Sequence, residues 1–107
     1  MYACQWHLDV PFGKQGEALK VMAEWGAEKL RSSGFRKVRG TRVMVGHVGA
    51  SASHVVDEYL FETLADFEVA LGDMGEERFR KLAERLAPYI VPGSQRWVVW
   101  RVVEPKA

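Results

Sequence analysis

The sequence has only one cysteine, Cys4, among its 107 residues. A single thiol excludes an internal disulfide and a zinc site built on several cysteines. Because Cys4 stands among apolar residues of a predicted strand, we expect a buried and unreactive thiol. This use of cysteine is typical of a reducing compartment, and we expect a cytoplasmic protein.

Long apolar runs and excess charge of one sign are also missing. No run approaches the roughly 20 apolar residues of a membrane helix, and no apolar leader segment follows Met1. We therefore expect no membrane partner. The formal net charge is +1, so overall charge does not attract the chain to nucleic acid.

Large apolar side chains are plentiful by comparison. Hydrophobic residues make up 48% of the chain, and it has four Trp, five Phe and three Tyr. A chain of this length forms one core, so we expect a single domain over residues 1–107.

Hydrophobic periodicity and turn residues predict the order of the elements. Strands are expected over 2–10, 35–48, 54–62 and 96–104. A helix is expected over 14–31, with an inward stripe of Leu19, Met22, Gly26 and Leu30 flanked by Ala18, Ala23 and Trp25. Gly34 is expected to cap that helix in the left-handed conformation. The capping pattern Thr63-Leu-Ala-Asp66 opens a further helix, which Gly72 ends, and Asp73-Met-Gly-Glu76 opens another.

This order, β-α-β-β-α(α)-β, predicts an α+β, ferredoxin-like fold with a four-stranded antiparallel sheet and helices on one face. The last strand is apolar on both sides, with Trp97 and Val99 on one and Val98 and Trp100 on the other. Helices cover only one face, and a monomer seldom leaves so much apolar surface bare. We therefore expect a homodimer through the open sheet face.

The segment "DEYLFETLADFEVAL…ERFRKLAERLAPYI" and the Pro11–Lys14 entry to the first helix resemble a known superfamily. They are similar to dimeric α/β-barrel proteins of the antibiotic-biosynthesis-monooxygenase and NIPSNAP-like branches. The resemblance implies two ferredoxin-like sheets packed around a cavity. Haem-degrading members need a helix histidine, and no predicted helix of this chain has one. We therefore expect no cofactor.

Candidate site residues lie on the strands. Gln5, His7 and Asp9 share one side of the first strand, opposite the apolar side. A neutral His7 can act as a general base or hydrogen-bond a ligand carbonyl. Neighbours predicted to complete a ligand site for a small aromatic or carboxylate compound are Asp57, Tyr59, Trp97 and Arg101, the last as an anion partner.

The stretch "HVGASASH" joins two predicted strands and raises other possibilities. If Val48 pairs with Ser53, His47 and His54 face each other, but two imidazoles alone are a poor metal site. Ser51 lacks the second glycine of a nucleophile elbow. We interpret this stretch as a hairpin loop and expect no metal.

The element order is also that of RNA-recognition motifs, and Arg36, Lys37, Arg39 and Arg42 form a basic cluster. The third strand has carboxylates where those modules carry basic and aromatic residues, so RNA binding is disfavoured. The cations more plausibly protect an edge strand or pair across a dimer. Two functions stay open: a cofactor-independent monooxygenase- or isomerase-like enzyme on an aromatic or enolisable substrate, and a non-enzymatic NIPSNAP-like binding protein with a structural or stress-related role.

Overall fold

The computed structural model describes residues 1–31 and 34–103. The elements are β1 (Tyr2–Asp9), α1 (Gln15–Lys29), β2 (Gly40–Val45), β3 (His54–Phe61), α2 (Leu64–Asp73), α3 (Glu77–Leu86) and β4 (Arg96–Arg101). Short 3-10 turns cover Phe35–Lys37 and Ala87–Tyr89. The predicted order of strands and helices is confirmed.

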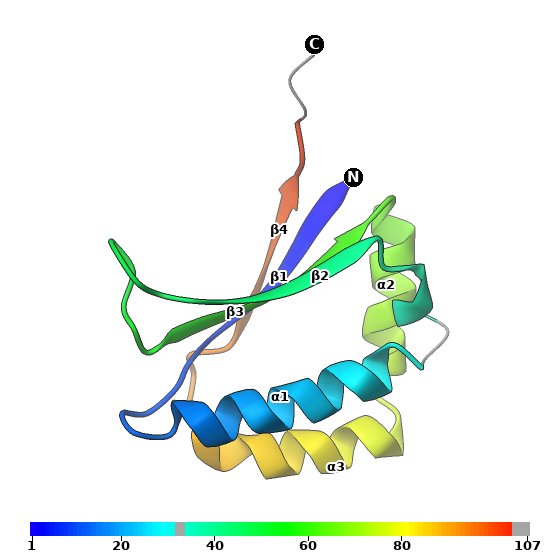
Figure 1. Cartoon of the computed structure of the whole chain (residues 1–107). Helices are drawn as coiled ribbons and strands as arrows, with labels where there is room; N and C mark the ends of the chain where they lie inside the picture. The colour runs from blue at the N-terminus through cyan, green and yellow to red at the C-terminus, as the bar shows by residue number, and fades with distance from the viewer. Residues whose placement is uncertain (32–33, 104–107) are drawn as a thin grey trace.

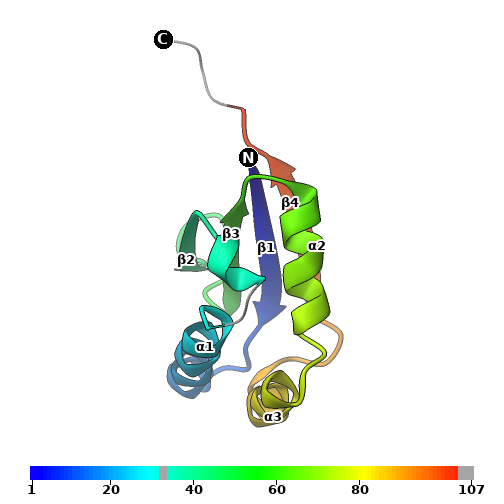
Figure 2. The same ribbon diagram turned by 90° about the vertical axis from the view of Figure 1, so that its right-hand side faces the viewer.

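The four strands form one antiparallel sheet in the order β2-β3-β1-β4. Figures 1 and 2 show the three helices on one side of this sheet, with α1 and α3 side by side. The other side of the sheet has no covering element among the described residues. The fold is α+β and ferredoxin-like, as predicted.

Helix α1 buries only part of the predicted stripe, namely Met22 with the flanking Ala18 and Trp25. Its buried residues are Ala18, Val21, Met22, Trp25 and Lys29. Leu30, predicted to face inward, is 49% exposed. The stripe is rotated because Trp25 and Lys29, four residues apart, both turn toward the sheet.

The connection after α1 also differs from the prediction. Gly34 has φ −69°, so it is not a left-handed cap. A glycine is needed there for a different reason, because an added Cβ would lie 2.6 Å from the Cα of Ala70 in α2. The backbone N–H of Gly34 donates to Asp73 at 2.9 Å, which joins this turn to the end of α2.

Helix α2 begins as predicted, since the Thr63 hydroxyl accepts a hydrogen bond from the Asp66 N–H at 3.1 Å. It ends later than predicted, because it continues through Gly72 to Asp73. The second capping signal is wrong: the N-cap of α3 is Glu76, and no side chain caps it.

The remaining differences concern strand ends. The predicted strand 35–48 begins with a 3-10 turn, and the strand β2 itself covers Gly40–Val45. The last strand ends at Arg101, and position 104 of its predicted range lies outside the described residues. Within residues 1–31 and 34–103, no helix is both long and apolar enough to cross a membrane.

Candidate functional site on the open face of the sheet

Strand β1 separates its side chains cleanly between the two sheet faces. Cys4, Trp6 and Leu8 are buried toward the helices, while Gln5 and His7 alternate with them on the open face. The predicted orientation of Gln5, His7 and Asp9 is therefore confirmed. These three residues begin the candidate site.

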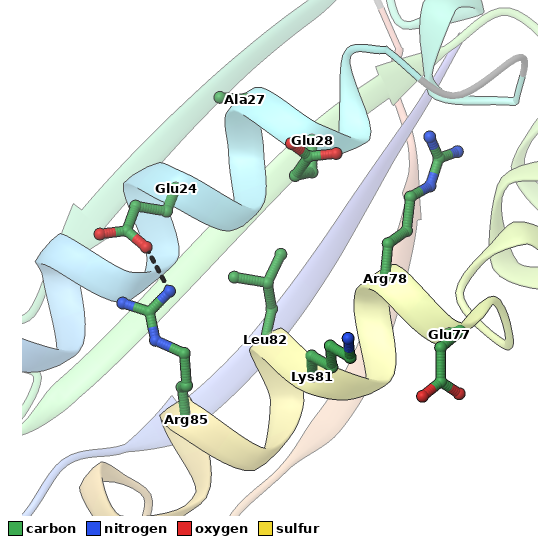
Figure 3. A pocket seen from close by; sticks show the side chains of 8 residues that line it. All are labelled: Glu24, Ala27, Glu28, Glu77, Arg78, Lys81, Leu82 and Arg85. Carbon is green, nitrogen blue, oxygen red and sulfur yellow. Dashed lines mark hydrogen bonds and ion pairs between the residues drawn. The ribbon is translucent and has the colours of Figure 1, made fainter.

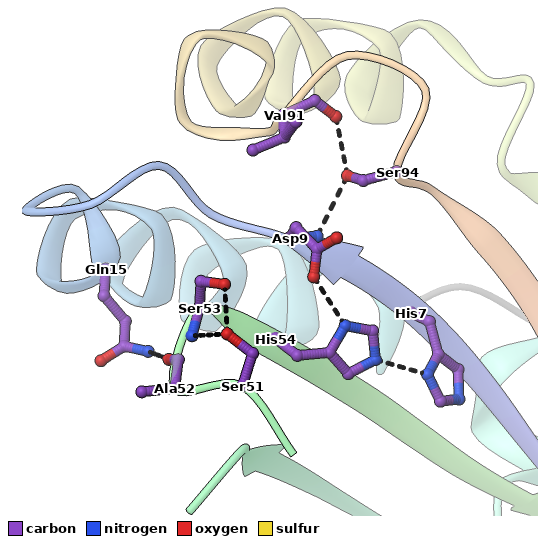
Figure 4. Close-up of polar contacts among 9 residues, drawn as sticks. All are labelled: His7, Asp9, Gln15, Ser51, Ala52, Ser53, His54, Val91 and Ser94. Atoms are coloured by element: carbon purple, nitrogen blue, oxygen red, sulfur yellow. Dashed lines mark hydrogen bonds and ion pairs between the residues drawn. The ribbon is translucent and has the colours of Figure 1, made fainter.

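A chain of hydrogen bonds runs along this face from Asp9 to Gln5. Nδ1 of His54 lies 2.8 Å from Oδ1 of Asp9, its direct cross-strand partner. Nε2 of His54 lies 2.8 Å from Nδ1 of His7, and Figure 4 draws both contacts. Nε2 of His7 lies 2.9 Å from Oε1 of Gln5. Two strands thus place a carboxylate, two imidazoles and an amide in one row.

The row continues beyond Gln5 to the edge of the sheet. The amide nitrogen of Gln5 donates to Glu58 at 2.8 Å, and Nε of Arg42 donates to the same carboxylate at 2.7 Å. The indole N–H of Trp100 donates to Oε1 of Gln5 at 3.0 Å. Because its nitrogen faces a carboxylate and its oxygen faces an indole N–H, the amide of Gln5 has one satisfactory orientation.

The surroundings shift the pKa values of two groups in the row. Burial would raise the pKa of the Glu58 carboxyl, but hydrogen bonds from Arg42 and Gln5 outweigh burial, and the pKa is lowered. Burial lowers the pKa of His7, and the nearby His54 and Arg96 lower it further. A neutral His7 beside an ionised Glu58 is the favoured state.

A shallow hollow of about 300 Å³ adjoins the row. Gln5 and His54 supply polar groups to its wall, and the hairpin supplies His47. Its other lining residues are apolar or small: Met44, Val45, Gly46, Val48, Ala50 and Val56. An apolar wall with a few convergent polar groups is typical of a small-molecule site.

Asp57 and Tyr59 do not join this site, so their predicted position beside His7 is wrong. Both are buried on the helix-facing side of β3, 6% and 2% exposed. The Tyr59 hydroxyl donates to Asp57 at 2.6 Å, and the ammonium of Lys29 from α1 lies 2.8 Å from that hydroxyl and 3.4 Å from Asp57. The alternation along a strand places Asp57 and Tyr59 on the same side of the sheet, but it does not show which side the helices cover.

Trp97 and Arg101 are also on the helix-facing side of the sheet, so their predicted position in a cavity with His7 is wrong. Trp97 lies opposite Trp6 and packs edge-on against Phe67, with ring centroids 5.1 Å apart. Arg101 lies opposite Tyr2 and is exposed. From β4, the open face receives Arg96, Val98 and Trp100 instead.

The stretch from His47 to His54 is a hairpin loop, as predicted, but His47 does not face His54. The N–H of Gly46 donates to the carbonyl of His54, so Gly46 takes the opposing position. Ser51 and Ser53 bond to each other at 2.8 Å, as Figure 4 shows, and neither contacts an imidazole in the contacts drawn. In the part of the chain that the structure describes, no three His, Cys, Asp or Glu side chains form a metal-binding group.

The basic cluster lies on and before the edge strand β2, and three of its four cations pair with carboxylates. Ion pairs join Arg42 to Glu58, Arg39 to Glu62 and Lys37 to Asp66. Paired cations along an edge strand discourage strand addition. This arrangement fits the protective role better than a phosphate-binding one.

A larger depression lies on the opposite side of the molecule, between α1 and α3 (Figure 3). It has a volume of about 770 Å³ and is lined mainly by charged side chains. Glu24 and Arg85 form an ion pair across it. Exposed charges that satisfy each other are poor candidates for chemistry, so the open sheet face remains the better site.

The sequence alone did not identify His54 and Glu58 as members of this site. A signal for His54 is present, since it begins one predicted strand and Asp9 lies one residue before the end of another. Only the β1–β3 register, Asp9 opposite His54 and Gln5 opposite Glu58, converts that signal into contacts.

No known family model matches the sequence, and no curated protein matches it either. Solved structures do match over nearly the whole chain. A NIPSNAP family protein from Agrobacterium tumefaciens has a TM-score of 0.74 at 19% identity, with 96% of this chain and 93% of that chain covered. Protein Atu4242 of the same organism has a TM-score of 0.75 at 14% identity, covering 96% and 94%. The cofactor-independent oxygenase SnoaB from Streptomyces nogalater, solved as a variant, has 0.70 at 14% identity, covering 97% and 94%.

These similarities confirm the predicted resemblance at the level of the fold. The chain has the ferredoxin-like architecture that NIPSNAP family proteins and antibiotic-biosynthesis-monooxygenase-like proteins share. Identities below 20% leave the chemistry to the residues of this chain.

Proposed function

We propose that two copies of this chain pair through their open sheet faces and enclose a site for a small aromatic ligand with a carbonyl, phenol or carboxylate oxygen. The observation that supports this most directly is the row of Asp9, His54, His7 and Gln5 beside an apolar hollow. The single cysteine agrees with a cytoplasmic location, which belongs to the same proposal.

Exposed apolar side chains support a second copy as the cover. Trp100 is 59% exposed on the open face, with Val98 and Leu60 partly exposed on the same face. Removing apolar surface from water contributes about 25 cal/mol per Å², so covering this face favours association. A two-fold axis over the sheet places the same patch on both partners and closes the assembly at two.

The chemistry follows from the position of His7. A neutral imidazole that donates through Nε2 can hydrogen-bond a ligand oxygen. It stabilises the negative charge that develops when water or hydroxide from solvent takes the proton of a neighbouring C–H or of the O–H. Enolate or phenolate formation of this kind begins both isomerisation and cofactor-independent oxygenation. The oxygenase SnoaB shares the fold, which favours this reaction class.

A ligand-exchange experiment tests the proposal. The protein is mixed with aromatic keto acids and phenols in deuterated water, and NMR follows both line broadening of each compound and deuterium entry at its acidic carbon. We expect at least one compound to bind and exchange, with at least a tenfold slower exchange for His7→Ala. Lys20→Ala is the control, because Lys20 is exposed on α1, outside both the row and the hollow. Equal exchange by wild type and His7→Ala contradicts the role of His7.

A NIPSNAP-like protein that binds without turnover is the second candidate. The similarity to a NIPSNAP family protein, with a TM-score of 0.74, favours it. The same experiment separates the two candidates, since a binding protein broadens the ligand signals in a His7-dependent way while the exchange rate stays at that of the buffer.

A further inference from the structure

The hydrogen bonds of the row determine where its protons are. Each contact contains one hydrogen, supplied by one of its two atoms. The oxygen of Asp9 only accepts when ionised, so Nδ1 of His54 bears a hydrogen. The oxygen of Gln5 also only accepts, and its amide cannot turn round without facing Glu58 and Trp100 with the wrong atoms. Nε2 of His7 therefore bears a hydrogen as well.

The remaining contact, from Nδ1 of His7 to Nε2 of His54 at 2.8 Å, needs one hydrogen of its own. The four ring nitrogens then hold three hydrogens, one more than two neutral imidazoles provide. The histidine pair has a charge of +1 when every contact is made. The carboxylate of Asp9 at 2.8 Å balances this charge.

Neighbouring charges decide which ring holds the extra proton. His54 lies directly beside Asp9, whereas His7 lies opposite Arg96 in the β1–β4 register. The other ionisable groups of this face are the Glu58–Arg42 ion pair, reached through Gln5, and His47, which shares the hollow with His54. The negative charge nearest the two rings is on Asp9, so the extra proton is more stable on His54.

We propose that Asp9 and a protonated His54 act as a positioning pair that holds His7 as a neutral donor, with its N–H on Nε2, aimed at an oxygen of the ligand. His7 is then a hydrogen-bond donor and not a general base. Because the N–H of His7 needs an acceptor, a carboxylate, enolate or phenolate oxygen of the ligand can take the place of Gln5 Oε1. A protonated amine has no acceptor and is rejected in that position. This choice of ligand rests on the proposed function, whereas the proton arrangement does not.

The proton arrangement is tested without any ligand. Nitrogen-15 NMR of the imidazole side chains reports which ring nitrogens are protonated in the intact protein. At about pH 6, close to the ordinary histidine range, we expect His7 with hydrogen on Nε2 alone and His54 with hydrogen on both nitrogens. A His7 with hydrogen on Nδ1 alone, or a neutral His54 across the whole range in which the fold is stable, overturns the proposal.

Two variants separate positioning from folding. In Asp9→Asn, nitrogen-15 NMR at the same pH should show a smaller fraction of His54 with hydrogen on both ring nitrogens, because the opposing charge is gone. In His54→Gln, His7 should show a mixture of both neutral tautomers. Circular dichroism confirms that each variant folds, and Lys20→Gln, an exposed position of α1, should leave both signals of the row unchanged. If Asp9→Asn folds and leaves that fraction unchanged, Asp9 does not stabilise the protonated form of His54.

The ligand class is tested separately with a matched pair, phenylacetate and phenethylamine. We expect phenylacetate to bind wild type at least tenfold more tightly than phenethylamine, and His54→Gln to remove most of that preference. Preferential binding of the amine overturns the ligand class. If the imidazole signals agree but neither compound binds and no keto acid exchanges, the proposed function fails while the proton arrangement stands.

Discussion

Replacing Lys29 tests the ion pair under the helices. Its side chain is 1% exposed, with the ammonium 3.4 Å from Asp57 and 2.8 Å from the Tyr59 hydroxyl. The rings of Trp6, Trp25, Phe35 and Tyr59 surround the ammonium at 4.6 to 5.8 Å from their centroids. In Lys29→Met the side-chain volume is nearly kept, but the buried carboxylate of Asp57 loses its opposite charge and keeps the hydrogen bond from the Tyr59 hydroxyl.

Removing one partner of a buried pair costs about 3–5 kcal/mol. A domain of this size is stable by about 5–15 kcal/mol in total, so Lys29→Met should be severely destabilised. Asp57→Asn should restore part of the loss, because the double variant buries no charge at this position. The coupling free energy between the two substitutions should be about 0.5–3 kcal/mol.

Urea unfolding followed by tryptophan fluorescence measures these free energies, at one fixed protein concentration because association adds to apparent stability. Lys20→Met, an exposed position of the same helix, is the control and should change stability by less than about 0.5 kcal/mol. The reasoning is refuted if Lys29→Met costs as little as that control, or if the effects of Lys29→Met and Asp57→Asn simply add.

Three further predictions follow from single contacts. The folded pKa of Glu58 is lowered, so the contribution of this carboxylate to stability is present above pH 4.5 and is lost as the pH falls through the folded pKa. Urea unfolding at a series of acidic pH values should therefore show a smaller loss of stability for Glu58→Gln than for wild type. Burial raises the pKa of Cys4 to about 11, so iodoacetamide at pH 8 should modify the thiol only after unfolding, and rapid labelling of the native protein would show that the thiol is accessible. Thr63→Ala removes the cap of α2 and should cost about 1 kcal/mol in thermal or urea unfolding, whereas Thr63→Ser should keep most of it; equal losses would show that the hydrogen bond to Asp66 is unimportant.

The sequence predicts the order of the elements because each has a strong local signal. The alternation in β1 separates His7 from Trp6, and the Thr63 cap is read from a four-residue pattern. Both features depend on residues close together in the chain. The structure confirms both for that reason.

The predictions of site residues are wrong where a local sequence pattern is compatible with two orientations of a strand. In β3, Asp57 and Tyr59 alternate with Val56 and Glu58. The polar side chains of Asp57 and Tyr59 suggest that this pair faces away from the core. They face inward because Lys29 meets them from α1. That lysine stands four residues after Trp25 on the apolar stripe, which is the one signal in the sequence for a buried cation. The contact between Asp9 and His54 depends on a strand register that no local pattern specifies.

Sedimentation equilibrium at micromolar concentration tests the central claim most directly, namely that a second copy covers the open sheet face. We expect wild type to sediment with about twice the chain mass of 12.1 kDa. Trp100→Ser, on the open face, should shift the equilibrium toward the single chain, whereas Val69→Ser, 52% exposed on α2, should not. A wild-type particle of 12.1 kDa at every concentration would contradict the pairing and the enclosed site that depends on it.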